Sequence, residues 1–179
     1  MQGNKPNMMQ SVEDIINNLH IPRWEELPRI ELYADQAVRY IESSLGVLFE
    51  KDEKNITTAM IHNYVKLKLM PKPVKKGYSN IHIAYLIIIT ILKQVLAIAE
   101  IKEGIVYQTG ISGKERAYNL FCEEQEYALK AMAYEMSGRV YAKKEIEENA
   151  ATVRMAVYAF ASKTLARKAI LHQPKKGKK

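Results

Sequence analysis

A twelve-residue segment, IHIAYLIIITIL from Ile81 to Leu92, is apolar on nearly every side of the helix it would form. A membrane-spanning helix needs about 20 apolar residues, and this segment is shorter and is closed by Lys93. A helix that is apolar all round is stable in water only when other elements surround it. We therefore expect a buried central helix over residues 79–96, around which the chain packs, and no stable membrane insertion.

The remaining residues show helical rather than alternating periodicity, so the expected fold class is all-α or nearly so. Capping boxes are predicted at Ser11 with Asp14 and at Ser112 with Glu115. Further helices are predicted over residues 11–20, 33–48, 57–70, 97–103, 112–136 and 145–171, with a turn bracketed by Gly110 and Gly113. The charged string at residues 50–55 is expected to be a solvated loop.

The last predicted helix carries apolar residues at heptad-like spacing. They are Ile146, Ala150, Val153, Val157, Phe160, Thr164 and Leu171. A seam of barely more than three heptads occurs more often between two helices of one chain than in a coiled-coil dimer. An intramolecular seam is therefore favoured, and a dimeric coiled coil stays open.

The positive charge of the chain is concentrated in two segments. The formal net charge is +7, but five lysines and no acid fall within residues 66–76, and seven basic residues fall within residues 163–179. Without these twelve residues the formal charge would be −5. A mildly acidic protein with two basic regions favours an anionic partner that binds at defined places.

No residue pattern supports catalysis, a metal site or a cofactor, so the chain is predicted not to be an enzyme. Cys122 is interpreted as a small buried hydrophobe, since no lysine cluster or second cysteine lies near it to activate it. His82 is interpreted as a partner for a helix start. The acidic group is interpreted as a solvated helix face; it consists of Glu123, Glu124 and Glu126. A single cysteine and the lack of a leader-like N-terminal pattern predict a cytoplasmic protein.

The predicted helix at residues 57–70 has two different faces. Thr57 or Thr58 is suited to cap its first turn. Its inner stripe consists of Ile61, Tyr64 or Val65, and Leu69. Its outer stripe consists of hydrogen-bonding or small residues and includes no acid: Thr58, Ala59, His62, Asn63 and Lys66.

A basic loop follows this helix, stiffened by Pro71 and Pro73, which cannot continue a helix. The major groove of DNA admits one helix whose polar side chains read base edges, and lysines beside it meet phosphate. A packed helix, a polar-faced helix, a basic loop and a core helix follow each other here in the order of a winged helix-turn-helix.

This region resembles the DNA-binding head of MerR-type regulators. The corresponding segments are Met60-Ile61-His62-Asn63-Tyr64 in the helix, Leu69-Met70-Pro71 in the turn, Tyr78-Ser79 at the end of the wing, and Ala97-Ile98-Ala99-Glu100-Ile101. His62 and Asn63 stand where the MerR pattern has arginine and an aromatic residue, and Lys68 stands where it has the turn glycine. The base preference of those regulators is therefore not transferred.

The whole arrangement resembles still more closely a bacterial family of domains of unknown function, numbered 1836. The resemblance covers roughly residues 28–105 and rests on Leu32-Tyr33-Ala34-Asp35-Gln36, Asn63-Tyr64-Val65-Lys66, Pro71-Lys72-Pro73 and the segment from His82 to Leu86. It implies a MerR-like transcription factor. We divide the chain into an N-terminal helix that packs on the head (1–27), a DNA-binding head (28–108), a C-terminal helical dimerisation or sensing region (109–172) and a basic tail (173–179).

We expect a transcriptional regulator that binds double-stranded DNA as a homodimer, with residues 57–69 in the major groove and residues 71–78 as a wing on phosphate. The predicted nucleic-acid-binding residues are Thr57, Thr58, His62, Asn63, Tyr64, Lys66, Lys68, Lys72, Lys75, Lys76 and Tyr78. Asn63 is the leading candidate for reading a base, with a local capping role as the alternative. Tyr64 is expected to serve both the core and, through its hydroxyl, a phosphate.

Two points stay open at this level. The C-terminal helices would either dimerise or sense a small-molecule effector of unknown identity. The alternative function is a non-catalytic α-helical adaptor or membrane-surface protein, in which the C-terminal lysines bind anionic lipid.

Overall fold

The structure is a computed structural model that describes residues 8–50 and 53–171. Helices make up most of these residues, with two isolated β-bridges and no β-strand among them, which confirms the all-α class. The α-helices are α1 (Met8–Asn18), α2 (Ala34–Leu45), α3 (Thr58–Lys66), α4 (Asn80–Leu92), α5 (Ile98–Ser112), α6 (Lys114–Met136) and α7 (Ala151–Leu171). Three short 3-10 helices are η1 (Trp24–Glu26), η2 (Gly46–Leu48) and η3 (Glu148–Ala150).

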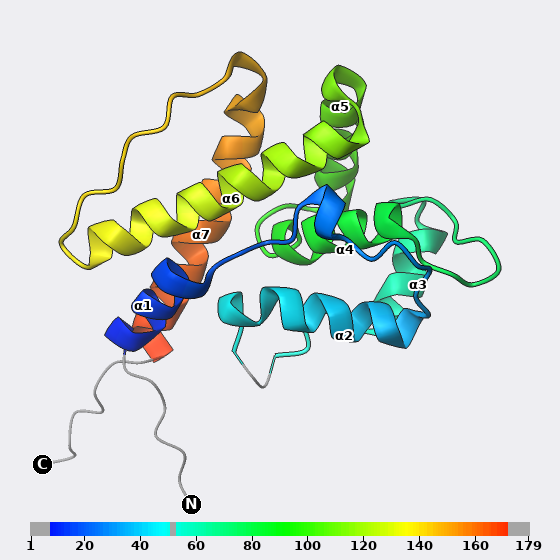
Figure 1. The fold of residues 1–179 in the computed structure, drawn as a ribbon, viewed down its shortest axis with the longest axis horizontal. Helices are drawn as coiled ribbons and strands as arrows, with labels where there is room; N and C mark the ends of the chain where they lie inside the picture. Colours follow the sequence, from blue (N-terminus) through cyan, green and yellow to red (C-terminus); the bar gives the residue numbers. More distant parts are fainter. Residues whose placement is uncertain (1–7, 51–52, 172–179) are drawn as a thin grey trace, which may run out of the picture.

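α4 is the buried central helix that its apolar sequence predicts (Figure 1). It contacts α2, α5, α6 and α7, and nine of its 13 residues are buried. The backbone N–H of Ser79, its N-cap residue, donates to Nδ1 of His82 over 3.0 Å, so His82 does serve the helix start. The helix ends at Leu92 rather than near residue 96, and the chain turns at residues 93–95.

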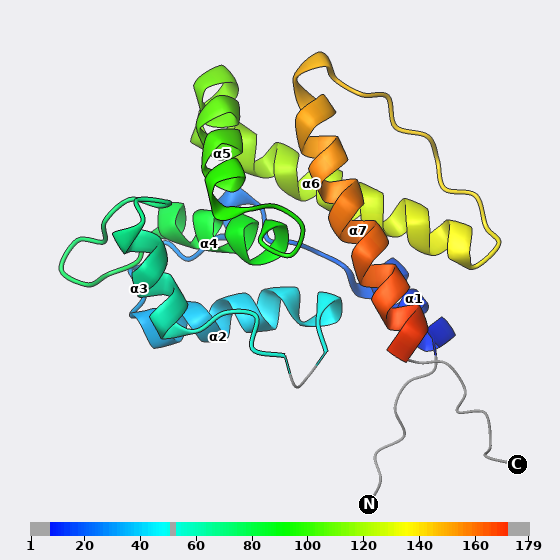
Figure 2. The same cartoon turned by 180° about the vertical axis from the view of Figure 1, so that it is seen from behind.

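α6 and α7 form the most extensive helix pair of the fold, and Figure 2 shows α7 crossing in front of α6, beside the head. Val157, Phe160 and Thr164 of α7 are buried inside this one chain, which supports the intramolecular seam over residues 150–164. Ile146 is exposed and precedes the helix, because α7 begins at Ala151 rather than at residue 145. A coiled-coil dimer along this stripe is therefore not available.

The acidic group on α6 is not a solvated face. Glu124 is only 1% exposed and accepts hydrogen bonds from Nε and Nη2 of Arg154 at 2.5 and 2.9 Å. Glu126 accepts the backbone N–H of Ile21 at 2.7 Å and is paired with Arg23. Only Glu123 lies on the surface as predicted. Successive positions on a helix point in different directions. Glu124 therefore forms a buried ion pair, Glu126 binds the segment before η1, and Glu123 faces the solvent.

Two predicted helix boundaries are wrong, and at α5 the reason is that packing outweighs the local signals. α1 begins at Met8, so Ser11 lies inside the helix and is not its cap. α5 continues through Gly104 and Gly110 to Ser112, because it buries Ile101, Ile105 and Gln108, whereas a helical glycine costs only about 1 kcal/mol. The chain turns at Gly113 alone, where φ is +78°.

The N-terminal helix is predicted to pack on the head, but α1 packs mainly against α6 and α7, with a smaller contact to η2. In the string at residues 50–55, Glu53 is paired with Arg167 of α7, and Glu50 lies 3.6 Å from Lys168. Residues 51–52 of that string and the basic tail at residues 173–179 lie outside the described residues.

Candidate nucleic-acid interface

α3 presents one buried face and one open face at the end of the molecule away from α1 (Figure 1). Ile61 and Tyr64 are buried, and α2 lies against the helix. The open face carries the side chains of Thr58, His62, Asn63 and Lys66, all exposed. Within the described residues none of these four side chains makes a hydrogen bond or ion pair, so their donors and acceptors are available to a partner.

Local interactions fix both ends of α3. The Oγ1 of Thr57 accepts the backbone N–H of Met60 at 3.2 Å, so Thr57 rather than Thr58 is the cap. At the other end, the N–H groups of Lys68 and Leu69 donate to the carbonyl oxygens of Val65 and Tyr64, each at 3.0 Å, which is a Schellman motif. Lys68 occupies the left-handed position of that motif, with φ of +54°.

This motif explains why the predicted helix of residues 57–70 ends at Lys66, before either proline. A glycine normally occupies the left-handed position. Here a lysine occupies it, and its side chain stays exposed beside the open face of α3.

The loop between α3 and α4 contains one tight turn, and we call residues 71–78 of this loop the wing, after the sequence prediction. Val74 and Gly77 form a β-bridge, and the N–H of Gly77 donates to the carbonyl oxygen of Val74 at 2.7 Å. Lys75 and Lys76 occupy the two central turn positions with φ of +46° and +67°. Such a turn strongly favours Asn-Gly or similar pairs, so two lysines there place two charges at the tip at a cost in backbone strain.

Tyr78 fastens the wing to the head. Its N–H and carbonyl oxygen are hydrogen-bonded to the backbone of Leu32 at 2.8 and 3.0 Å. Its ring is only 3% exposed and meets the ring of His82 edge-on. The side chain of Glu31 lies against the backbone of Gly77, where a Cβ atom would meet its Oε2 at 2.2 Å. Glycine at position 77 therefore permits this close approach.

A groove of about 500 Å³ runs between the C-terminal end of α3 and α5. Its apolar floor includes Leu69, Met70 and Ile105. Four lysines line it, namely Lys66, Lys68, Lys72 and Lys102. Sequence reasoning missed Lys102, because it lies 24 residues beyond the end of the wing and no spacing rule links it to α3. None of these lysines has an ion-pair partner among the described residues.

The structure divides the predicted binding residues into three groups. Thr57 caps a helix, and Tyr64 and Tyr78 lie in the core, where burial raises the pKa of both phenols. The exposed residues around the groove and the face of α3 are Thr58, His62, Asn63, Lys66 and Lys68, and those on the wing are Lys72, Lys75 and Lys76. The rings of Tyr64 and Tyr78 are therefore structural rather than surface groups.

The rest of the described chain offers no comparable set of reactive groups. Cys122 is fully buried, its thiol lies 3.8 Å from the carbonyl oxygen of Pro22, and burial raises its pKa to about 12. A thiol of that pKa is inert at neutral pH. Among the described residues, no cluster of three potential metal ligands is found, and no helix is both long and apolar enough to span a bilayer.

Comparison with known proteins gives one match. Residues 22–123, more than half of the chain, match the sequence model of DUF1836, a domain of unknown function. No curated protein and no solved structure matches the chain.

Proposed function

The chain belongs to the DUF1836 family, and we propose that it is a DNA-binding transcriptional regulator. The observation that carries the proposal is the surface formed by α3 and the wing. A helix face with hydrogen-bonding side chains and no acid lies beside lysines that have no acidic partner among the described residues. By contrast, Arg23, Arg139 and Arg154 elsewhere in the fold are each paired with a glutamate.

The dimensions of α3 suit the major groove. Nine helical residues span about 14 Å, and the groove is about 12 Å wide. With α3 in the major groove, Asn63 and His62 face base edges. Lys66, Lys68 and Lys102, which line the protein groove beside α3, contact one phosphate backbone of the DNA. The lysines at the wing tip meet the next phosphates.

The proposal rests on this surface rather than on the spacing of a helix-turn-helix. The connector between α2 and α3, residues 46–57, is longer than the three- or four-residue turn of that motif. α3 instead takes its position from contacts with α2 and from the wing, which is tied back to Leu32. A winged head with a long connector is therefore what we propose.

We also propose that the regulator binds as a two-fold homodimer, since one head of this size contacts too few bases for useful specificity. The apolar stripe of α7 is buried within the chain, so the dimer would form through another surface.

Binding to a random 20-base-pair duplex, measured by fluorescence anisotropy at several salt concentrations, tests the proposal. We expect a steep negative slope of log affinity against log salt. Changing Lys72, Lys75 or Lys76 to alanine should make the slope less steep by about 0.9 each, because each variant loses one phosphate contact.

Lys143→Ala is the matched control, since Lys143 is exposed in the loop between α6 and α7 and has no ion-pair partner among the described residues. It should leave the slope unchanged. A flat slope in the native protein, together with retained binding to anionic phospholipid vesicles, would reject DNA binding in favour of a membrane-surface protein.

A further inference from the structure

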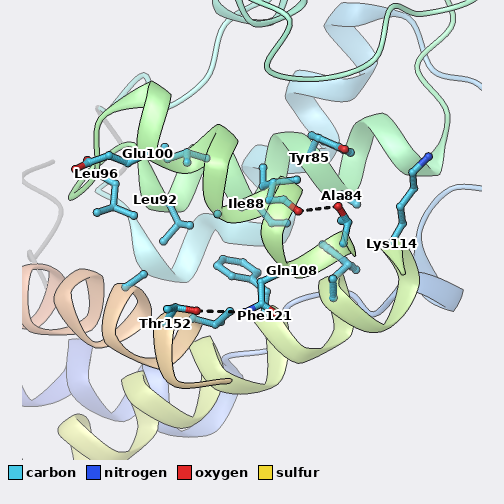
Figure 3. Close-up of a pocket in the computed structure, with 18 of the residues that line it drawn as sticks. Ala84, Tyr85, Ile88, Leu92, Leu96, Glu100, Gln108, Lys114, Phe121 and Thr152 are labelled. Atoms are coloured by element: carbon cyan, nitrogen blue, oxygen red, sulfur yellow. Dashed lines mark hydrogen bonds between the residues drawn. The ribbon is translucent and has the colours of Figure 1, made fainter. Parts of the chain in front are cut away.

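A second concave site shares only Tyr85 and Ile105 with the lysine groove. It is a cavity of about 240 Å³, partly open to solvent and lined by α4, α5, α6, α7 and Trp24 (Figure 3). Its wall is almost entirely apolar and includes the aromatic rings of Trp24, Tyr85 and Phe121. Ligand sites in proteins are typically concave and mostly apolar, with a few placed polar groups, so an apolar hollow of this size is a candidate ligand site.

One polar side chain in this wall is incompletely satisfied. Gln108 is 93% buried, and its Nε2 donates to the carbonyl oxygen of Asn149 at 2.9 Å and to Oγ1 of Thr152 at 3.2 Å. Its Oε1 is buried and has no hydrogen-bond partner among the described residues. A buried acceptor without a donor costs about 1–3 kcal/mol. A ligand with one N–H or O–H group would remove that cost.

The two charged residues of the lining lie at opposite ends of the labelled side chains in Figure 3. The carboxylate of Glu100 already accepts the backbone N–H of Ala97 at 2.7 Å. Lys114 is exposed at the start of α6 and has no ion-pair partner among the described residues. The lining therefore carries a positive charge at the Lys114 end and a negative charge at the Glu100 end, so an anionic group is favoured only beside Lys114.

We propose that this cavity binds a small, planar aromatic anion that carries one hydrogen-bond donor. The aromatic body fills the apolar space, the donor meets Oε1 of Gln108, and the anionic group lies beside Lys114. The volume suits a ligand of one or two rings, because an apolar cavity of roughly 150 Å³ already holds benzene. This inference does not depend on DNA binding.

Two glycines of α5 provide a matched pair of variants. A Cβ atom added at Gly104 or at Gly110 meets nothing within 4 Å, so either position accepts a side chain without a clash. Gly104 lines the cavity and Gly110 does not. Gly104→Leu should therefore fill the cavity, and Gly110→Leu should leave it open on the same helix.

The probe is 6-hydroxynaphthalene-2-sulfonate, a fluorescent two-ring aromatic anion with one O–H donor. We expect saturable one-to-one binding to the full chain by fluorescence titration, weakened at least about tenfold in Gly104→Leu and unchanged in Gly110→Leu. The O-methyl derivative of the probe lacks the donor and should bind about three- to tenfold more weakly. That difference should vanish in Gln108→Leu.

Lys114→Ala should weaken binding of the sulfonate probe by up to about fivefold. Equal binding to the two glycine variants would place the probe elsewhere and overturn the proposal, as would the absence of saturable binding. Equal affinity for the two probes would reject the role of Gln108. Circular dichroism of each variant confirms that it remains folded.

Discussion

At the scale of single residues, Lys68 occupies a backbone conformation that its residue type disfavours. It holds the left-handed position after α3 with φ of +54°, a conformation that costs a residue with a side chain about 1–2 kcal/mol. Lys68→Gly should raise the free energy of unfolding by up to about 1 kcal/mol, measured by urea denaturation, although glycine gives back part of the gain as chain entropy. Lys68→Ala removes the same charge but keeps the strain, so it should show no gain.

The strain at Lys68 and at the wing tip also bears on function. Backbone strain of this kind persists only where the surrounding structure holds it, and it is concentrated at functional sites. If the proposed function is right, Lys68→Gly should be more stable than the native protein and yet bind DNA more weakly, because a phosphate contact is lost. An unchanged salt slope in this variant would show that Lys68 lies outside the interface.

His82 is the residue whose protonation should alter stability near neutral pH. Its Nδ1 accepts the N–H of Ser79, and burial lowers its pKa, partly offset by the backbone of Lys72 and by Glu31. A histidine with a lowered folded pKa contributes stability above its unfolded pKa of about 6.5 and loses it as the pH falls. We therefore expect the urea midpoint to fall between pH 7.5 and 5.5.

His82→Gln isolates this effect, because glutamine keeps an acceptor at the third helical position and does not titrate. The variant should show a smaller loss of stability over the same pH range. If the two proteins lose the same stability between pH 7.5 and 5.5, the acid sensitivity comes from another group.

At the scale of helices, the sequence was most informative where one signal dominated. The positions of α4, with its continuous apolar run, and of α3, which is followed by two prolines, were predicted from the sequence, because no competing pattern overlaps them. α5 was cut short at Gly104, since the burial of Ile105 and Gln108 against α6 and α7 depends on residues more than ten positions away. Local propensity cannot register such distant packing.

In the candidate site, too, the features set by a local sequence signal were predicted, and those set by distant packing were missed. The open face of α3 and the wing lysines come from one continuous stretch, so periodicity and charge located them. Lys102 reaches the groove only because α5 packs beside α3, and the cavity is assembled from five elements. Neither the position of Lys102 in the groove nor the cavity can be recognised from the sequence. Burial of Tyr78 was also hidden, since a tyrosine in a loop suits both core and surface, whereas periodicity had already placed Tyr64 partly in the core.

The Glu124–Arg154 pair is the strongest polar link between α6 and α7. Arg154 also donates to the carbonyl oxygens of Lys144 and Glu145, at 2.9 and 3.1 Å, and so holds the loop between the helices. Glu124→Gln keeps the shape but leaves the Arg154 charge unbalanced. We expect a loss of about 3–5 kcal/mol in the free energy of unfolding by urea denaturation.

Glu123→Gln is the control at the adjacent position. The Glu123 carboxylate is half exposed and lies 3.6 Å from Lys144, and an exposed pair contributes at most about 1 kcal/mol. Similar losses in the two variants would mean that the net charge of α6, rather than the buried pair, governs its stability.

At the scale of the whole molecule, the head and the C-terminal helices share one core. The buried cluster includes Ile41 of α2, Leu86 of α4, Phe121 of α6 and Phe160 of α7. Ion pairs from Arg167 and Lys168 to the connector before α3 add a second link. Tyr85 and Ile105 line both the cavity and the lysine groove. A ligand in the cavity therefore lies one side chain away from the proposed DNA surface.

A shared core predicts that the head does not fold alone. The full chain should unfold in urea as one cooperative transition, seen identically by circular dichroism and by Trp24 fluorescence. A fragment of residues 28–108 lacks the α6 and α7 side chains that cover α4, so it should expose that apolar helix and show no cooperative transition. A longer fragment that ends at Met136 keeps α6 but not α7 and should recover only part of the stability. If the fragment of residues 28–108 unfolds with the midpoint of the full chain, the head is an independent domain, and the cavity and the lysine groove would then belong to separate units.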